Sequence, residues 1–153
     1  MRVANCYTIF RIEVKLCDEM SVRRVETEIL RKRALDFLEE ARIALKRGAF
    51  DIACFLAEQS LQLYLKFVLL KVLGDYPRTH SVRRLLGELN RLLGSEDLEE
   101  FVKANRFRLS VLEDAYLMAG YFVKEYDAED AEDMVKLTEE TIEIINRTLG
   151  EKR

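Results

Sequence analysis

Hydrophobic residues recur at helical spacing over most of this chain, and one stretch is apolar on almost every side. That stretch, residues 50–73, has the pattern of a helix with neighbours around most of its circumference. Gly74 follows it as a stop, and a turn with the only proline and the only histidine, Pro77 and His80, comes next. We therefore expect a central helix around which the rest of the chain is packed.

Further segments on both sides show a single apolar face, with apolar residues three and four positions apart. They are residues 22–47, 81–93, 98–122 and 127–149. The segment 98–122 is either one long helix or two helices joined near Arg106, and Ser81 is placed to cap the helix that it opens. Because the links between segments are short, the sequence predicts an all-α fold, an up-and-down bundle of four to five helices over residues 21–150.

The beginning of the chain has a different pattern. Residues 7–16 alternate between apolar and polar side chains, which is typical of a strand. We expect residues 1–20 to form a short extended arm or strand that pairs with its own copy in a second subunit, or that lies along the helices, because a lone strand leaves its backbone groups unpaired. The alternative is that Met20 is the natural start and that the first 19 residues are incidental.

Composition limits the class of protein. A chain of 153 residues, with 49% hydrophobic and 35% charged residues, can build one domain with a core that needs no metal or disulfide. Abundant Lys, Arg and Glu beside few Asn and Gln suit a thermophile. We find no apolar run of membrane-spanning length and no signal-peptide pattern, so we expect a cytoplasmic protein without membrane contact.

Cysteine and histidine are too sparse for a metal centre. The three cysteines form no CxxC pair, and a single histidine cannot complete a His-rich site. We therefore expect neither a metal site nor a cofactor. Cys54, in the central helix, is most simply a small core residue.

The net charge of −3 conceals an uneven distribution. Residues 1–50 and 78–91 carry an excess of Lys and Arg, whereas residues 123–145 are strongly acidic. A nucleotide or nucleic acid should therefore contact the basic part of the chain. The candidate binding residues are Lys66, Arg78, His80 and Arg83. Two simpler interpretations stay open: the arginines form a solvated helix face, and the His80 imidazole locks its turn by bonding a backbone carbonyl.

Three groups of residues around the central helix carry a family resemblance. They are Gly48, Phe50 and Asp51 before it, Ala57, Gln59, Ser60 and Lys66 within it, and Pro77, Thr79, His80 and Ser81 after it. In their order and spacing, over roughly residues 22–148, the chain resembles the HEPN family of small prokaryotic helical domains.

The resemblance implies a homodimeric helical bundle, often encoded beside a minimal nucleotidyltransferase in toxin–antitoxin-like pairs. In the active branch of the family it also implies a metal-independent RNase, which uses an Arg followed after four to six residues by His. The positions that would have to be arginine before His80 are Leu73, Gly74 and Asp75. We therefore expect no catalytic residue of the family type.

Three hypotheses follow. We favour a non-catalytic homodimeric interaction module, which binds a nucleotide or RNA or partners a nucleotidyltransferase. The second is an enzyme in which His80 acts on a phosphate together with Arg78, Arg83 or Lys66. The third is a purely structural bundle without a ligand.

Overall fold

The computed structural model of the protein describes the backbone of residues 6–121 and 125–150, with side chains over 17–117 and 125–150. Over these residues it contains six helices and no strand. They are α1 (Cys6–Lys46), α2 (Phe50–Leu73), α3 (Val82–Leu93), α4 (Glu96–Ala104), α5 (Arg106–Tyr121) and α6 (Ala128–Thr148). The predicted all-α bundle is confirmed, with six helices rather than four to five.

The sixth helix arises because the segment predicted over residues 98–122 is two helices. They meet at Asn105, whose backbone N–H and side-chain amide both donate to the carbonyl of Phe101. The Asn105 side-chain oxygen in turn accepts from Arg108, at 2.7 Å. The predicted junction near Arg106 is therefore confirmed, and a polar side chain that competes for backbone groups explains it.

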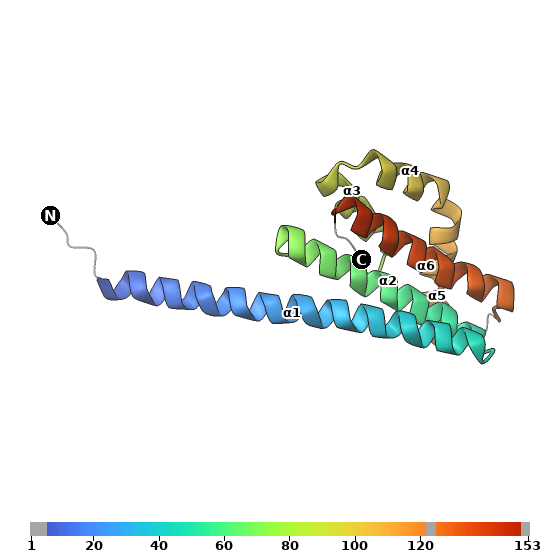
Figure 1. Ribbon diagram of the computed structural model, residues 1–153. Coiled ribbons are helices and arrows are strands. Elements are labelled where there is room, and N and C mark those ends of the chain that lie inside the picture. The colour runs from blue at the N-terminus through green and yellow to red at the C-terminus, as the bar shows by residue number, and fades with distance from the viewer. Residues whose placement is uncertain (1–5, 122–124, 151–153) are drawn as a thin grey trace.

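Helix α2 is the centre of the bundle. It packs most extensively on α1 and also contacts α6, α5 and α3 (Figure 1). Leu61, Leu65 and Leu69, one turn apart, are fully buried. By length and composition alone α2 could cross a membrane, so the expectation that no apolar run reaches membrane-spanning length is not met; most of this apolar window lies inside the bundle. The predicted central helix is thus confirmed.

Side-chain hydroxyl groups that donate to backbone carbonyls connect α2 to α1 and α6 to α2. Ser60 Oγ donates to the carbonyl of Ala34 on α1, at 2.7 Å, and Thr138 Oγ1 on α6 donates to the carbonyl of Ala57, at 3.2 Å. Because the partners are alanines, the helices can approach closely at both points. Cys54, as predicted, is a buried core residue.

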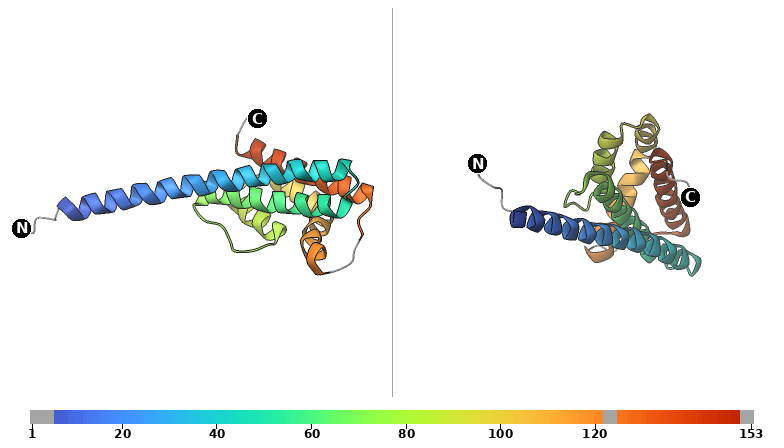
Figure 2. Two further views of the ribbon diagram at one scale, coloured as in Figure 1. Left: turned by 90° about the horizontal axis from the view of Figure 1, so that it is seen from below. Right: turned by 60° about the vertical axis from the view of Figure 1, so that its left-hand side comes forward.

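The strand predicted over residues 7–16 is wrong, since these residues belong to α1. Between residues 6 and 47 no glycine or proline interrupts the helix. Extending a helix that already exists adds one hydrogen bond for each residue fixed, whereas an isolated strand pairs with nothing. The continuing helix therefore outweighs the local alternation of apolar and polar residues. As a result, α1 projects well beyond the end of α2 (Figures 1 and 2).

The predicted helix ends are formed as expected. Ser81 Oγ accepts from the backbone N–H of Arg84, and Ser95 Oγ accepts from that of Leu98, both at 3.2 Å. At the other end of the turn, Gly74 has φ of +81°, which an L side chain adopts only with strain. Gly74 and Ser81 thus define the segment between α2 and α3 that builds the candidate site.

Candidate functional site

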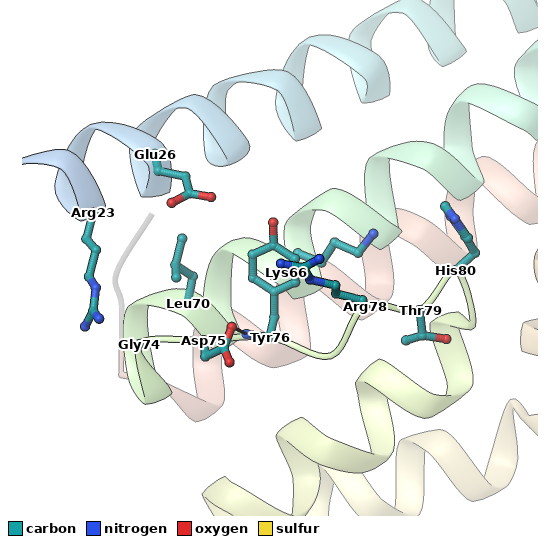
Figure 3. Close-up of a pocket in the computed structure, with 10 residues that line it drawn as sticks. All are labelled: Arg23, Glu26, Lys66, Leu70, Gly74, Asp75, Tyr76, Arg78, Thr79 and His80. Carbon is teal, nitrogen blue, oxygen red and sulfur yellow. Dashed lines mark hydrogen bonds between the residues drawn. The ribbon is translucent and has the colours of Figure 1, made fainter. Parts of the chain in front are cut away.

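A cavity of about 500 Å³ lies between α1, the end of α2 and the turn that follows it. Its lining residues come from these three segments (Figure 3). They are Arg23, Glu26, Lys66, Leu70, Gly74, Asp75, Tyr76, Arg78, Thr79 and His80. The cavity thus brings together three of the four predicted binding residues, Lys66, Arg78 and His80. It also includes Arg23, which the sequence did not indicate as a binding residue.

A row of polar side chains on α2 runs into this cavity. Glu58, Gln62 and Lys66 are four residues apart, so they share one face of the helix. Gln62 Oε1 accepts from Lys66 Nζ at 2.8 Å, and Gln62 Nε2 donates to Glu58 Oε1 at 3.0 Å. Gln62 therefore links a buried carboxylate to the ammonium group that lines the cavity.

His80 is attached to the bundle on two sides. Its ring stacks on Tyr116 of α5, and its Nδ1 lies 3.3 Å from Gln62 Oε1. Because Gln62 Oε1 can only accept, a hydrogen bond in this contact requires the proton on Nδ1. The turn is held in place by the Gln62 side chain, whose Nε2 also donates to the backbone carbonyl of His80. The imidazole itself bonds this side chain and not a backbone carbonyl, as one of the sequence interpretations had it.

Glu58, next to the cavity lining, is a second residue that sequence reasoning missed. It is fully buried, and its carboxylate accepts from Gln62 Nε2 and from Gln59 Nε2, the latter at 2.7 Å. Burial raises the pKa of Glu58 to about 7, although the two amide donors act in the opposite direction. The sequence held one signal for Glu58: it is an acidic residue inside the most apolar stretch, one helical turn from Gln62.

Lys66 lies between the buried network and the cavity. Burial lowers the pKa of its ammonium group, while the nearby Glu58 acts to raise that pKa. Lys66 Nζ also lies 5.9 Å from the ring centroid of Tyr76, a distance typical of a cation–π contact. The charge of Lys66 is therefore less hydrated than that of a surface lysine, and it faces the cavity together with an aromatic ring.

Arg83, the fourth predicted residue, does not line this cavity. Its backbone N–H and its Nε both donate to Glu113 Oε2 on α5, at 3.1 and 3.3 Å. Ser81 Oγ donates to the same oxygen at 3.1 Å. Arg83 thus fastens the start of α3 to α5, and its guanidinium faces another part of the surface.

The donors that line the cavity suit an anion. Arg23, Lys66 and Arg78 supply three cationic groups, against the carboxylates of Glu26 and Asp75. Across the residues with described side chains, no group of three or more His, Cys, Asp or Glu is arranged to hold a metal ion. A phosphate-bearing ligand with a planar base matches the combination of cations and the Tyr76 ring.

Comparisons with known proteins agree with the fold. The HEPN domain profile matches residues 27–148, and a comparison with curated proteins finds no match. One similar solved structure is ST0689, an archaeal HEPN homologue, with a TM-score of 0.60 and 23% identity, covering 79% of this chain and 95% of that one. Another is TT1696 from Thermus thermophilus, with a TM-score of 0.62 and 22% identity, covering 80% and 97%. At these identities the two structures show a shared fold, and the profile match over most of the chain shows that it belongs to the HEPN domain family.

Proposed function

We propose that this HEPN domain protein is a non-catalytic binding module whose cavity beside the 74–80 turn holds a nucleotide. The observation that carries the proposal is that Arg23, Lys66 and Arg78 all line one cavity, which Tyr76 also lines. Three separate segments supply these cations, so the fold rather than local sequence brings them together (Figure 3). A volume of about 500 Å³ suits a small ligand.

Each group has a role in this proposal. Arg78 is exposed and presents a planar guanidinium that can bind phosphate oxygens in pairs, whereas Lys66 acts as a point charge whose Nζ is positioned by Gln62. The Tyr76 ring provides a surface for the base. Glu26 and Asp75 supply acceptors for sugar hydroxyl groups.

Isothermal titration calorimetry with ATP, AMP and pyrophosphate tests the proposal. We expect ATP to bind more tightly than AMP, and Lys66→Ala or Arg78→Ala to weaken ATP binding by about tenfold or more, because each removes a charge-assisted hydrogen bond. Lys46→Ala, which removes an exposed cation at the far end of α1, is the matched control. Unchanged ATP affinity in both cavity variants, or no binding by the wild type, would refute the nucleotide site.

The absence of catalysis is a separate part of the proposal. His80 has its ring against Tyr116 and its Nδ1 against Gln62, an arrangement that positions the turn. We expect purified protein to leave labelled RNA intact without metal. Metal-independent cleavage that disappears in His80→Ala would instead establish the RNase alternative.

A second proposal concerns assembly: the protein forms a homodimer through the outer face of α1. Val22, Val25 and Ile29 support it, because they lie three and four residues apart and are 65%, 58% and 43% exposed. Apolar groups gathered on one helix face gain stability when a partner covers them. Sedimentation equilibrium should show a dimer that Val25→Glu dissociates, whereas Leu92→Glu, also exposed but on α3, leaves it intact.

A nucleotidyltransferase partner is the remaining part of the proposed interaction role. The family resemblance supports it, and co-expression with a minimal nucleotidyltransferase encoded next to this protein provides the test. Co-purification of the two proteins at equal stoichiometry is the expected result. Failure to co-purify would refute the partner proposal, whereas the nucleotide site is tested separately by calorimetry.

A further inference from the structure

A second cavity, of about 430 Å³, lies where α3, α4 and α5 meet, apart from the candidate nucleotide site. Its lining comes from the start of α3, the end of α4 and the start of α5. The lining residues are Arg83, Lys103, Ala104, Arg106, Phe107 and Ser110. None of the residues that line the nucleotide cavity is among them.

Phe107 is unusually exposed for an aromatic residue. Its relative exposure of 80% is higher than that of any other large hydrophobic residue whose side chain is described. A single exposed ring surrounded by polar groups is smaller than the apolar centre of a typical protein interface. A flat aromatic surface of this size instead matches the face of one nucleobase.

The charges around the ring are predominantly positive. Arg83, Lys103 and Arg106 line the cavity, and no carboxylate does. Glu113 pairs with Arg83, and Glu99 pairs with Lys103, so two of these cations are partly neutralised from behind the cavity. Arg106 has no ion pair with any residue that the structure describes, and its charge is available to a ligand.

The backbone that carries Phe107 is fixed by its neighbour in the sequence. The next residue, Arg108, binds Asp133 on α6 through Nε and Nη2, at 2.9 and 2.5 Å, and binds Glu140 through Nη1, at 3.2 Å. These contacts hold the first turn of α5 against α6. The backbone that carries Phe107 is therefore held in place, so a base that stacks on the ring has to order only the side chain.

We propose that this cavity is a binding site for single-stranded nucleic acid, in which a base stacks on Phe107 and the flanking phosphates contact Arg106, Lys103 and Arg83. An exposed aromatic ring among cations is the arrangement by which proteins bind single strands with little sequence preference. The site does not rest on the nucleotide cavity, because the two share no lining residue.

Fluorescence anisotropy with labelled uridine RNA and thymidine DNA of about 12 nucleotides tests the site. We expect binding at about 50 mM salt that weakens markedly at about 200 mM, because phosphate contacts release counterions. Phe107→Ala should weaken binding about tenfold, and Phe107→Trp should retain it. Arg106→Ala should weaken binding of both oligonucleotides and reduce the dependence on salt.

Three controls make the outcome decisive. Leu117→Ala removes an exposed apolar side chain from the same helix outside both cavities and should bind like the wild type. Lys66→Ala and Arg78→Ala should also bind the oligonucleotides normally, even if both lose ATP binding. Preference for the RNA or for the DNA then identifies which nucleic acid the site takes.

Several results would overturn the proposal. The proposal is wrong if wild-type protein binds neither oligonucleotide at low salt. It is also wrong if Phe107→Ala binds them as tightly as the wild type. Loss of binding in Lys66→Ala but not in Phe107→Ala would place the strand in the nucleotide cavity instead. A change of oligomeric state in Phe107→Ala, measured by light scattering, would identify Phe107 as a subunit contact.

Discussion

The imidazole of His80 lies parallel to the ring of Tyr116, with 4.8 Å between ring centroids and 9° between ring planes. This stack connects the turn after α2 to the middle of α5, two segments that are far apart in the sequence. His80, Arg78 and Tyr76 belong to the same turn and line the same cavity. The position of the turn, and with it the arrangement of the candidate nucleotide site, therefore depends on an aromatic contact with α5.

Replacement of Tyr116 tests this dependence. Tyr116→Ala removes the stack and should lower the free energy of unfolding by more than about 1 kcal/mol, since an aromatic pair contributes about that much beyond the area it buries and the half-buried ring is lost as well. Because the turn loses its support, ATP affinity should also fall, whereas Tyr116→Phe keeps the ring and should preserve both properties. Urea unfolding and calorimetry measure the two effects. Normal ATP affinity in Tyr116→Ala would show that the turn is held mainly by Gln62.

Glu58 should make stability depend on pH. Its folded pKa of about 7 is above the ordinary value of 4.5, so its stabilising contribution is fully present below pH 4.5 and is lost as pH rises through 7. The difference amounts to at most about 3 kcal/mol. Glu58→Gln keeps the shape of the side chain without the charge, so its stability relative to the wild type should increase as pH rises from about 4.5 to about 8.

Chemical unfolding at a series of pH values measures this difference between the two proteins. Glu28→Gln, an exposed substitution on α1, is the matched control, and the change with pH should be larger for Glu58→Gln than for Glu28→Gln. A difference for Glu58→Gln that does not change with pH would mean that water or a rearrangement solvates the carboxylate in the folded protein.

Much of the fold could be predicted from the sequence because local signals and packing agree there. Ser81 follows a turn and precedes an apolar stripe, and it caps α3 as that pattern predicts. The stretch 50–73, apolar on almost every side, forms the central helix of the bundle. The strand prediction for residues 7–16 failed because it rested on a local alternation of period two. The helical state of these residues depends instead on α1, which continues through them.

The candidate site was only partly predictable, since it depends on contacts between distant segments. Lys66, Arg78 and His80 could be selected because they lie in or next to one conspicuous turn. Arg23 could not, because it is one of many cations on α1 and only the antiparallel packing of α1 on α2 brings it to the cavity. Arg83 is close to His80 in sequence, yet it lies in the first turn of α3, where its side chain contacts Glu113 and does not line the cavity.

Lys66 gives the nucleotide site a distinct pH dependence. Its pKa is lowered by burial from the ordinary 10.5, so its ammonium group loses its proton at a lower pH than an exposed lysine does. We therefore expect ATP affinity to fall with rising pH at values below the ordinary lysine pKa of 10.5. Lys66→Arg keeps the positive charge at all these values and should give a flatter profile in calorimetry. A wild-type profile as flat as that of Lys66→Arg would exclude Lys66 from direct contact with the phosphates.

Arg108 should contribute more to stability than an ordinary surface arginine. Its guanidinium binds Asp133 through two parallel hydrogen bonds and also reaches Glu140 and Asn105, so it joins α5 to α6 at several points. Arg108→Ala should therefore lower the free energy of unfolding by about 1–2 kcal/mol, and Arg108→Lys by about half of that, because an ammonium group cannot form the paired bonds. Arg91→Ala breaks one exposed pair with Glu88 within α3 and should cost no more than about 0.5 kcal/mol. Urea unfolding of the three variants measures these differences, and equal losses for Arg108→Ala and Arg91→Ala would mean that solvent screening cancels the advantage of the shared network.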